Sequence, residues 1–270
     1  MAWAGDRVQA EEESTYCRAV YPNAHELFAP LLADPRELQT GPRYEMPVSH
    51  TPQAEADMGD YVGLYRWCLG HQGDQGRLQI TAGAGFFGQF DYYNTKNLEA
   101  ADVIANLALD YRRGRWSSRV MSHHFSSHLG DDVIGAGQHY PGTREYNAVK
   151  GLLSYDASKY VRLYGAGIYE IESKGIGDNP WGTQSGFEAY SQIFHHNSLR
   201  VYWANDLQSW GRSAWNPTIN SQLGVKTAHD LTRDRAVSYF VEFFSGREPP
   251  LQFYQQKQTR WGLGIKFELS

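Results

Sequence analysis

The chain has 270 residues and a net charge of −5, and it combines 27 Gly, 18 Tyr, 12 Phe and 8 Trp with a mean hydropathy of −0.57. No stretch approaches the roughly 20 consecutive apolar residues of a membrane-spanning helix, and the basic residues are too scattered to form a surface for DNA or RNA. A chain that is rich in aromatic residues yet polar on average is typical of a membrane β-barrel, which is apolar outside and polar inside.

The first 41 residues precede the strand pattern. Ala2 and Ala4 match a signal-peptide cleavage pattern, although the apolar core of a signal peptide is missing. An apolar stretch between Pro22 and Pro35 is too short to be a domain. We expect residues 1–41 to form a periplasmic segment or an inward plug, and residues 42–270 to form the barrel.

Cys17 and Cys68 are the only cysteines, and their spacing indicates no zinc, redox or haem motif. The pair fits one disulfide in an oxidising periplasm, and it fits two unpaired thiols equally.

Apolar and polar residues alternate with a period of two in many segments, which predicts strands with one apolar and one polar face. Weaker copies surround Tyr44, Tyr61, Val149, Phe187, Val201 and Val237, and clear copies cover residues 78–90, 103–112, 160–171, 219–226 and 260–269. In the last of these, Trp261, Leu263, Ile265, Phe267 and Leu269 alternate with charged residues and glycine. One such strand is also normal in a soluble sheet, but the repetition favours an all-β, transmembrane, up-and-down antiparallel barrel of about 12 strands.

Short and long connections alternate along the chain. Residues 113–114, 156–158 and 196–197 are predicted tight turns, and residues 129–143, 172–182 and 208–216 are predicted loops rich in Gly, Asp, Asn and Pro. Because outer-membrane barrels have short periplasmic turns and longer extracellular loops, we expect both ends of the barrel chain on the periplasmic side. Pro47 and residues 61–69 fit the strand pattern poorly.

Charges of both signs lie on the predicted inner faces, and we expect them to pair and fill a narrow lumen. They are Arg66, Asp110, Arg112, Lys150, Arg162, Glu170, Glu188, Lys226, Glu242, Arg260, Lys266 and Glu268. A wide pore is therefore not expected.

Two stretches resemble a bacterial family of predicted outer-membrane proteins that is known only as a domain of unknown function. They are residues 27–36, Leu-Phe-Ala-Pro-Leu-Leu-Ala-Asp-Pro-Arg, and residues 124–131, His-Phe-Ser-Ser-His-Leu-Gly-Asp. Residues 88–91, 152–155 and 262–264 also fit the family, so the resemblance covers most of the chain. It implies a barrel in the bacterial outer membrane and supplies no activity.

His124 and Ser126 lie two apart on a predicted strand, so their side chains share a face with Val120. The pair resembles a His-x-Ser arrangement that outer-membrane phospholipase A and the lipid A deacylases carry on the lipid-facing surface, with an Asn or Glu on the next strand orienting the histidine. Pairing across the 129–143 loop places Ser126 roughly opposite Asn147. We interpret Ser126 as nucleophile, His124 as base and Asn147 as orienting group of an acyl-ester hydrolase.

The alternatives stay open at this point. His and Ser are common at the rim of a barrel, the Asn that often follows the serine in those enzymes is missing, and an outward Met121 with Phe125 would turn His124 inward. Besides hydrolysis of phospholipid or lipopolysaccharide, the chain fits a non-catalytic barrel that anchors another envelope or surface protein, or a narrow channel. Membrane lipid is the expected partner of the hydrolase. Nucleic acid is not expected as a partner for any of the three functions.

Four histidines, His123, His124, His128 and His139, raise the question of a metal site. Along a strand His124 and His128 would be about 13 Å apart, too far to share one ion. Asp131 and Asp132 with loop carbonyls are candidate calcium ligands, but the spacing of an EF-hand is missing, which favours a solvated loop. We therefore expect no cofactor.

Overall fold

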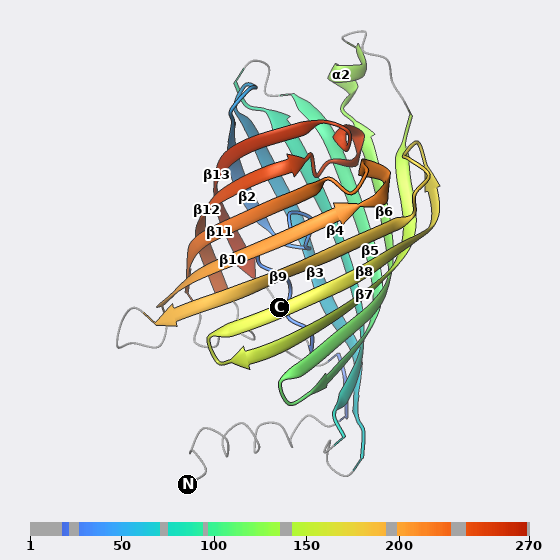
Figure 1. The fold of residues 1–270 in the computed structure, drawn as a ribbon, viewed down its shortest axis with the longest axis vertical. Helices are drawn as coiled ribbons and strands as arrows, with labels where there is room; N and C mark the ends of the chain where they lie inside the picture. The colour runs from blue at the N-terminus through green and yellow to red at the C-terminus, as the bar shows by residue number, and fades with distance from the viewer. Residues whose placement is uncertain are drawn as a thin grey trace.

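The computed structural model describes residues 18–21, 27–70, 75–93, 97–135, 142–192, 199–227 and 236–268. Twelve strands, β2 to β13, form one closed antiparallel barrel, and the short β1 pairs with β3 outside the ring (Figure 1). The strands are β1 (Arg18–Val20), β2 (Gly41–Pro47), β3 (Gln53–Cys68), β4 (Arg77–Asp91), β5 (Leu98–Arg113), β6 (Trp116–Leu129), β7 (Arg144–Ser158), β8 (Val161–Lys174), β9 (Trp181–Gln192), β10 (Leu199–Trp210), β11 (Pro217–Thr227), β12 (Ala236–Arg247) and β13 (Lys257–Glu268). The short helical pieces are α2 (Asp131–Gly135), η2 (Gly211–Ser213) and η3 (Leu251–Phe253). The predicted fold class and strand number are confirmed.

The two ends of the barrel differ in their connections. Two-residue turns at 114–115 and 159–160 lie at the end where β2 begins and β13 ends, which we call the turn end. The connections at 69–76, 193–198 and 228–235 lie at the same end and are longer, so the predicted alternation of short and long connections holds only in part. Longer connections at 130–143, 175–180, 211–216 and 248–256 lie at the opposite end, the loop end, where α2 projects in Figure 1. The turn predicted at 156–158 is wrong by two residues, because β7 continues through an irregularity to Ser158. The turn predicted at 196–197 lies outside the described residues.

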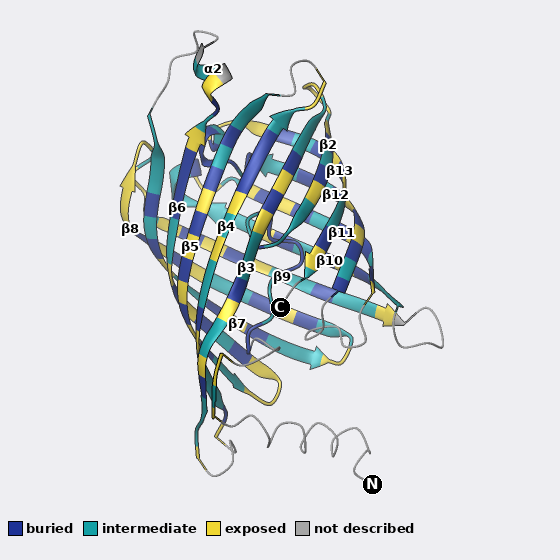
Figure 2. Cartoon of the chain, turned by 180° about the vertical axis from the view of Figure 1, so that it is seen from behind, coloured by how far each residue is buried: buried dark blue, intermediate teal, exposed yellow. Residues whose placement is uncertain are grey.

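Side chains alternate between the outer surface and the lumen on each strand, as the stripes of exposed and buried residues in Figure 2 show. On β13, Trp261 and Leu263 are 52% and 51% exposed, whereas Arg260 is 1% exposed. An apolar outer face of this kind, which recurs on most strands of the barrel, is typical of a barrel in lipid. Within the described residues, no helix is long and apolar enough to cross a membrane.

Both segments that resist the strand pattern have a physical explanation. Pro47 is the last residue of β2, so its missing N–H removes no hydrogen bond from the middle of the ladder. On β3 a bulge between Gly63 and Tyr65 shifts the register, and this exchanges the faces of the residues that follow. Val62 is therefore exposed while Arg66 is buried, although both have even numbers.

Residues 27–40, which we call the inner segment, lie inside the barrel and appear as a blue coil there in Figure 1. Their backbone carbonyls accept hydrogen bonds from lumen side chains: Arg119 to Phe28 (3.3 Å), Arg162 to Ala29 (2.8 Å), Asn220 to Ala33 (2.9 Å) and Lys266 to Leu32 (2.5 Å). The Asp34 carboxylate accepts from Gln184 at 2.8 Å and from Gln208 at 3.1 Å. The inner segment thus uses the lumen charges as partners. The predicted division at residue 41 stays an interpretation, because residues 1–17 and 22–26 are outside the described ranges.

Many of the remaining lumen charges pair with one another. Asp110 receives two hydrogen bonds from Arg119, at 2.7 and 2.9 Å, and Arg260 lies 3.0 Å from Glu45. Buried charges require such partners, because removing an ion from water is costly. Near the turn end, Cys68 is disulfide-bonded. Of the two alternatives, one disulfide or two unpaired thiols, the structure therefore has the disulfide. Cys17, the other cysteine of the chain, is outside the described residues.

Candidate active site on the outer face of the barrel

Strand β6 sets the direction of the predicted site residues. Its odd-numbered residues point into the lumen, where Met121 and Phe125 are 5% and 3% exposed. Its even-numbered residues point outward, and Val120 is 55% exposed. His124 and Ser126 therefore lie on the outer face with Val120, and the alternative in which Met121 and Phe125 face outward is wrong.

His124 on β6 and Asn147 on β7 are direct cross-strand partners. The His124 Nδ1 atom lies 2.8 Å from Asn147 Oδ1, and on the other side the Asn147 Nδ2 group donates to Glu172 Oε2 at 3.3 Å. A carboxylate only accepts, so Glu172 requires the amide N–H₂ to face it and the amide oxygen to face His124. His124 Nδ1 must then carry the hydrogen, which leaves the lone pair of a neutral ring on Nε2.

The register between β6 and β7 differs from the expected one by two residues. Ser126 pairs with Glu145, and Asn147 pairs with His124. A shift of two keeps every side chain on its predicted face, which is why the outward direction is still correct. The observed register places Asn147 beside His124 rather than beside Ser126. An orienting group has to lie beside the histidine, because it acts by holding the imidazole ring.

Ser126 lies in the next cross-strand row toward the loop end, between Val103 on β5 and Glu145 on β7. It is 8% exposed. Among the hydrogen bonds of the described residues there is none between Ser126 and His124. Residues two apart on a strand are separated by about 6.6 Å along the chain, and hydrogen bonds in ligand-free active sites are often long. The structure thus brings His124 and Asn147 together and leaves Ser126 as a neighbour on the same face.

Glu172 is not among the site residues predicted from the sequence, because residues 172–182 have the composition of a loop. Strand β8 instead runs to Lys174, and an irregularity opposite Asn147 and Ala148 places Glu172 across from Asn147. No parity rule reveals this, because a bulge exchanges the two faces. A continued strand with carboxylates at 170 and 172 was the only signal in the sequence.

The site lies where the apolar outer surface ends. Toward the turn end, the outward neighbours of His124 and Asn147 include Val149 and Tyr169, which are 41% and 44% exposed. Toward the loop end, Lys174 lies 3.8 Å from Glu145. In a bilayer such a border lies near the boundary between acyl chains and headgroups, which is also where the ester bonds of phospholipids are.

The described histidines of this region, His123, His124 and His128, point in different directions. His123 points into the lumen and His124 outward, and Nδ1 of the exposed His128 is 3.4 Å from Thr143 Oγ1. Throughout the described ranges, no three His, Cys, Asp or Glu side chains gather closely enough to hold a metal ion. The Asp132 side chain and His139 are outside those ranges, so the expectation of a solvated loop without calcium at Asp131 and Asp132 stays a prediction.

The fold is similar to that of outer-membrane phospholipases. The dimeric outer membrane phospholipase of Salmonella typhi with bound calcium superposes with a TM-score of 0.56 at 14% identity, covering 87% of this chain and 93% of that one. The phospholipase A of Escherichia coli gives the same TM-score and identity with coverages of 90% and 100%. A mutant of that enzyme, in which an active-site asparagine is replaced by alanine, gives 0.51 at 13% identity with coverages of 87% and 93%.

Because the sequence identity is low, this likeness shows a shared barrel fold and no more. No curated protein matches the sequence significantly. The family model described as "Protein of unknown function (DUF1207)" matches residues 3–269, and the chain therefore belongs to that family.

Proposed function

We propose that the protein is a bacterial outer-membrane hydrolase of lipid acyl esters, with Ser126 as nucleophile, His124 as general base and Asn147 as orienting group. The observation that carries the proposal is the 2.8 Å hydrogen bond between His124 and Asn147 on the outer face, one cross-strand row from Ser126. The outer-membrane location is supported by the fold and by the apolar outer surface. The asparagine in the active site of the E. coli phospholipase supports a role for Asn147.

In this mechanism the Ser126 hydroxyl attacks the carbonyl carbon of an ester while His124 Nε2 takes the hydroxyl proton. The proton passes to the leaving alcohol oxygen as the carbon–oxygen bond breaks, and the acyl group stays on Ser126. Water then attacks the acyl-enzyme, again giving its proton to His124, and a free fatty acid leaves as Ser126 regains its proton. Asn147 keeps Nδ1 protonated and Nε2 facing the reaction throughout. We expect the hydrogen bond between Ser126 and His124 to form when substrate covers the site.

A specific observation favours a second candidate, a barrel that anchors another envelope component without catalysis. Ser126 is only 8% exposed, and a nucleophile has to reach its substrate. A channel is the less favoured role, because the inner segment is bonded to the lumen wall from several strands.

Hydrolysis of labelled phospholipid and of lipopolysaccharide by the purified full-length barrel distinguishes the two candidates. Ser126→Ala should abolish release of fatty acid while the barrel stays folded. Ser122→Ala is the matched control, because Ser122 lies on the outer face of the same strand and pairs with Val149 rather than with the site. No hydrolysis by the wild type, or equal loss in both variants, would leave the anchor as the better account.

A further inference from the structure

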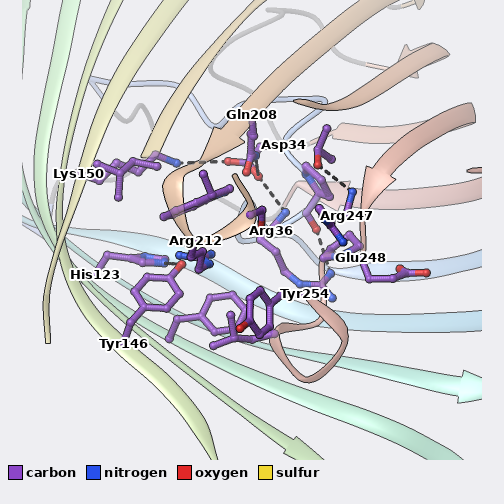
Figure 3. Close-up of a pocket in the computed structure, with 18 residues that line it drawn as sticks. Asp34, Arg36, His123, Tyr146, Lys150, Gln208, Arg212, Arg247, Glu248 and Tyr254 are labelled. Carbon is purple, nitrogen blue, oxygen red and sulfur yellow. Dashed lines mark hydrogen bonds and ion pairs between the residues drawn. The ribbon is translucent and has the colours of Figure 1, made fainter. Parts of the chain in front are cut away.

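A cavity of about 90 Å³, lined in part by His123, lies inside the barrel toward the loop end (Figure 3). The outward-facing His124 lies on the other side of the wall. Asp34 and Arg36 of the inner segment line one side of it, and η2 and the 248–256 connection line others. One water molecule needs roughly 10–15 Å³ of cavity volume measured in this way. The cavity therefore has room for several waters, or for one six-membered ring with one substituent. It is therefore large enough for a small organic molecule.

Much of the cavity wall is aromatic or aliphatic. The rings of Phe125 and Tyr146 are stacked with centroids 5.3 Å apart, and Trp210 lies 5.9 Å from Tyr146. Ile168 and Leu251 complete the apolar part. Sites for small molecules typically combine such a wall with a few polar groups that fix the orientation of the ligand.

Most charges at the cavity already have partners. Arg36 pairs with Glu55 and Asp102, and Lys150 lies 3.4 Å from Asp34. The other two pairs are Arg212 with Glu170 and Glu248 with Arg260. The charges of these groups are neutralised by their partners, so these groups are poor candidates for binding a charged ligand.

Arg247 differs from them. It has no carboxylate within 4.0 Å in the part of the chain that the structure describes, and the one hydrogen bond of its guanidinium goes to the backbone carbonyl of Gln255. Its Nε atom is buried without a partner. A buried donor that lacks a partner is unfavourable, and a guanidinium matches the two oxygens of a carboxylate.

The backbone next to Arg247 is adapted to this placement. Gly246 has φ of +148°, and a Cβ atom there would lie 2.5 Å from Thr218 Cα. The Thr218 hydroxyl accepts a hydrogen bond from the Arg247 N–H at 3.0 Å. Only glycine allows β12 to approach β11 this closely, and the close approach holds Arg247 at the cavity.

We infer that this cavity binds a small organic carboxylate, with the carboxylate on Arg247 and an apolar or aromatic body against Tyr146, Ile168 and Leu251. The site is separate from the proposed hydrolase site, because the barrel wall lies between them and the two share no residue. A carboxylate fits better than phosphate, since one unpaired guanidinium offsets one negative charge and the walls are apolar.

Calorimetry with the full-length protein in detergent tests the inference, with benzoate as the probe and benzamide as its neutral counterpart. Benzoate should bind at a single site, and benzamide should bind at least about tenfold more weakly. Arg247→Gln should lower benzoate affinity by about tenfold or more, and Arg247→Lys by less, because lysine keeps the charge but not the fork. Arg115→Gln removes the same charge at the turn end and should change nothing. Ser126→Ala should also bind benzoate normally, which separates this site from the hydrolase.

Three results would overturn the inference. They are the absence of benzoate binding to the folded wild type, equal binding of benzoate and benzamide, and unchanged benzoate affinity in Arg247→Gln. Inorganic phosphate that binds as tightly as benzoate, and depends equally on Arg247, would also overturn it, because the cavity would then be a general anion site. Faster migration of unheated than of heated protein on a denaturing gel confirms that each variant is folded.

Discussion

His123 and His124 are neighbours in the sequence, but their side chains lie on opposite sides of the barrel wall. His124 Nδ1 is bonded to Asn147 at 2.8 Å outside, whereas in the lumen His123 is 2.7 Å from Asn106 Oδ1 and 3.2 Å from the Tyr146 hydroxyl. The two histidines therefore have different tasks, and single substitutions should separate them.

Replacing His124 by alanine should lower ester hydrolysis by about 100-fold or more with little change in stability, because the variant loses a general base on the outer surface. Replacing His123 by alanine should instead destabilise the barrel by roughly 1–3 kcal/mol, because Asn106 and Tyr146 lose a buried partner. Hydrolysis per folded molecule and unfolding in urea, followed by gel mobility, measure both effects. Equal loss of activity in the two folded variants would contradict the assignment.

Glu172 is expected to act as a positioning residue through Asn147. Glu172→Ala should lower the hydrolysis rate by about tenfold, since a hydrogen bond to a charged group contributes roughly 1.5 kcal/mol. Glu172→Gln still offers an acceptor and should lose less. Glu145→Gln, which changes a carboxylate that pairs with Lys174 at the same rim, is the control and should stay within about twofold. A purely structural role of Glu172 would lower the amount of folded protein without changing kcat.

The inner segment should keep the barrel closed to ions in a way that depends on Asp34. Burial alone would raise the pKa of Asp34, but the Lys150 ammonium and hydrogen bonds from Arg36 and Gln184 bring it below the ordinary value of 3.8. Because the folded pKa is depressed, the anchoring by ionised Asp34 is present above the ordinary value and is lost as the pH falls through the folded pKa.

Planar-bilayer conductance of the wild type should therefore be very small at neutral pH and rise only below about pH 3.8. Asp34→Asn should show a higher conductance at neutral pH and a weaker response to acid. Large conductance of the wild type at neutral pH would show that the inner segment does not close the lumen.

The strands and their faces could be predicted from the sequence, because each barrel strand lies between an apolar outside and a polar inside. The period-two alternation records this directly, as on β13 from Arg260 to Phe267. The register between β6 and β7 could not be predicted from the sequence, because a 14-residue connection at 130–143 allows pairings that differ by two residues.

Bulges and long-range contacts were also beyond the sequence pattern. The irregularities after Gly63 and Asn147 exchange faces locally, so Val62 and Arg66 lie on opposite sides of the wall although both have even numbers, and Glu172 lies across from Asn147. The contacts of the inner segment join residues far apart in the chain, such as Lys266 and Leu32, and alternation along a strand says nothing about them. Arg247 was missed for the same reason, since its unpaired charge shows only once the partners of the other charges are known.

Covalent labelling of the serine tests the central claim most directly. A fluorophosphonate with a long alkyl chain reacts with serines that an adjacent base activates, and mass spectrometry of the labelled full-length protein identifies the modified residue. We expect the label on Ser126, loss of labelling in Ser126→Ala and strong reduction in His124→Ala, with Ser122→Ala labelled like the wild type. No label on Ser126 in a folded barrel, or labelling that persists in His124→Ala, would contradict the account.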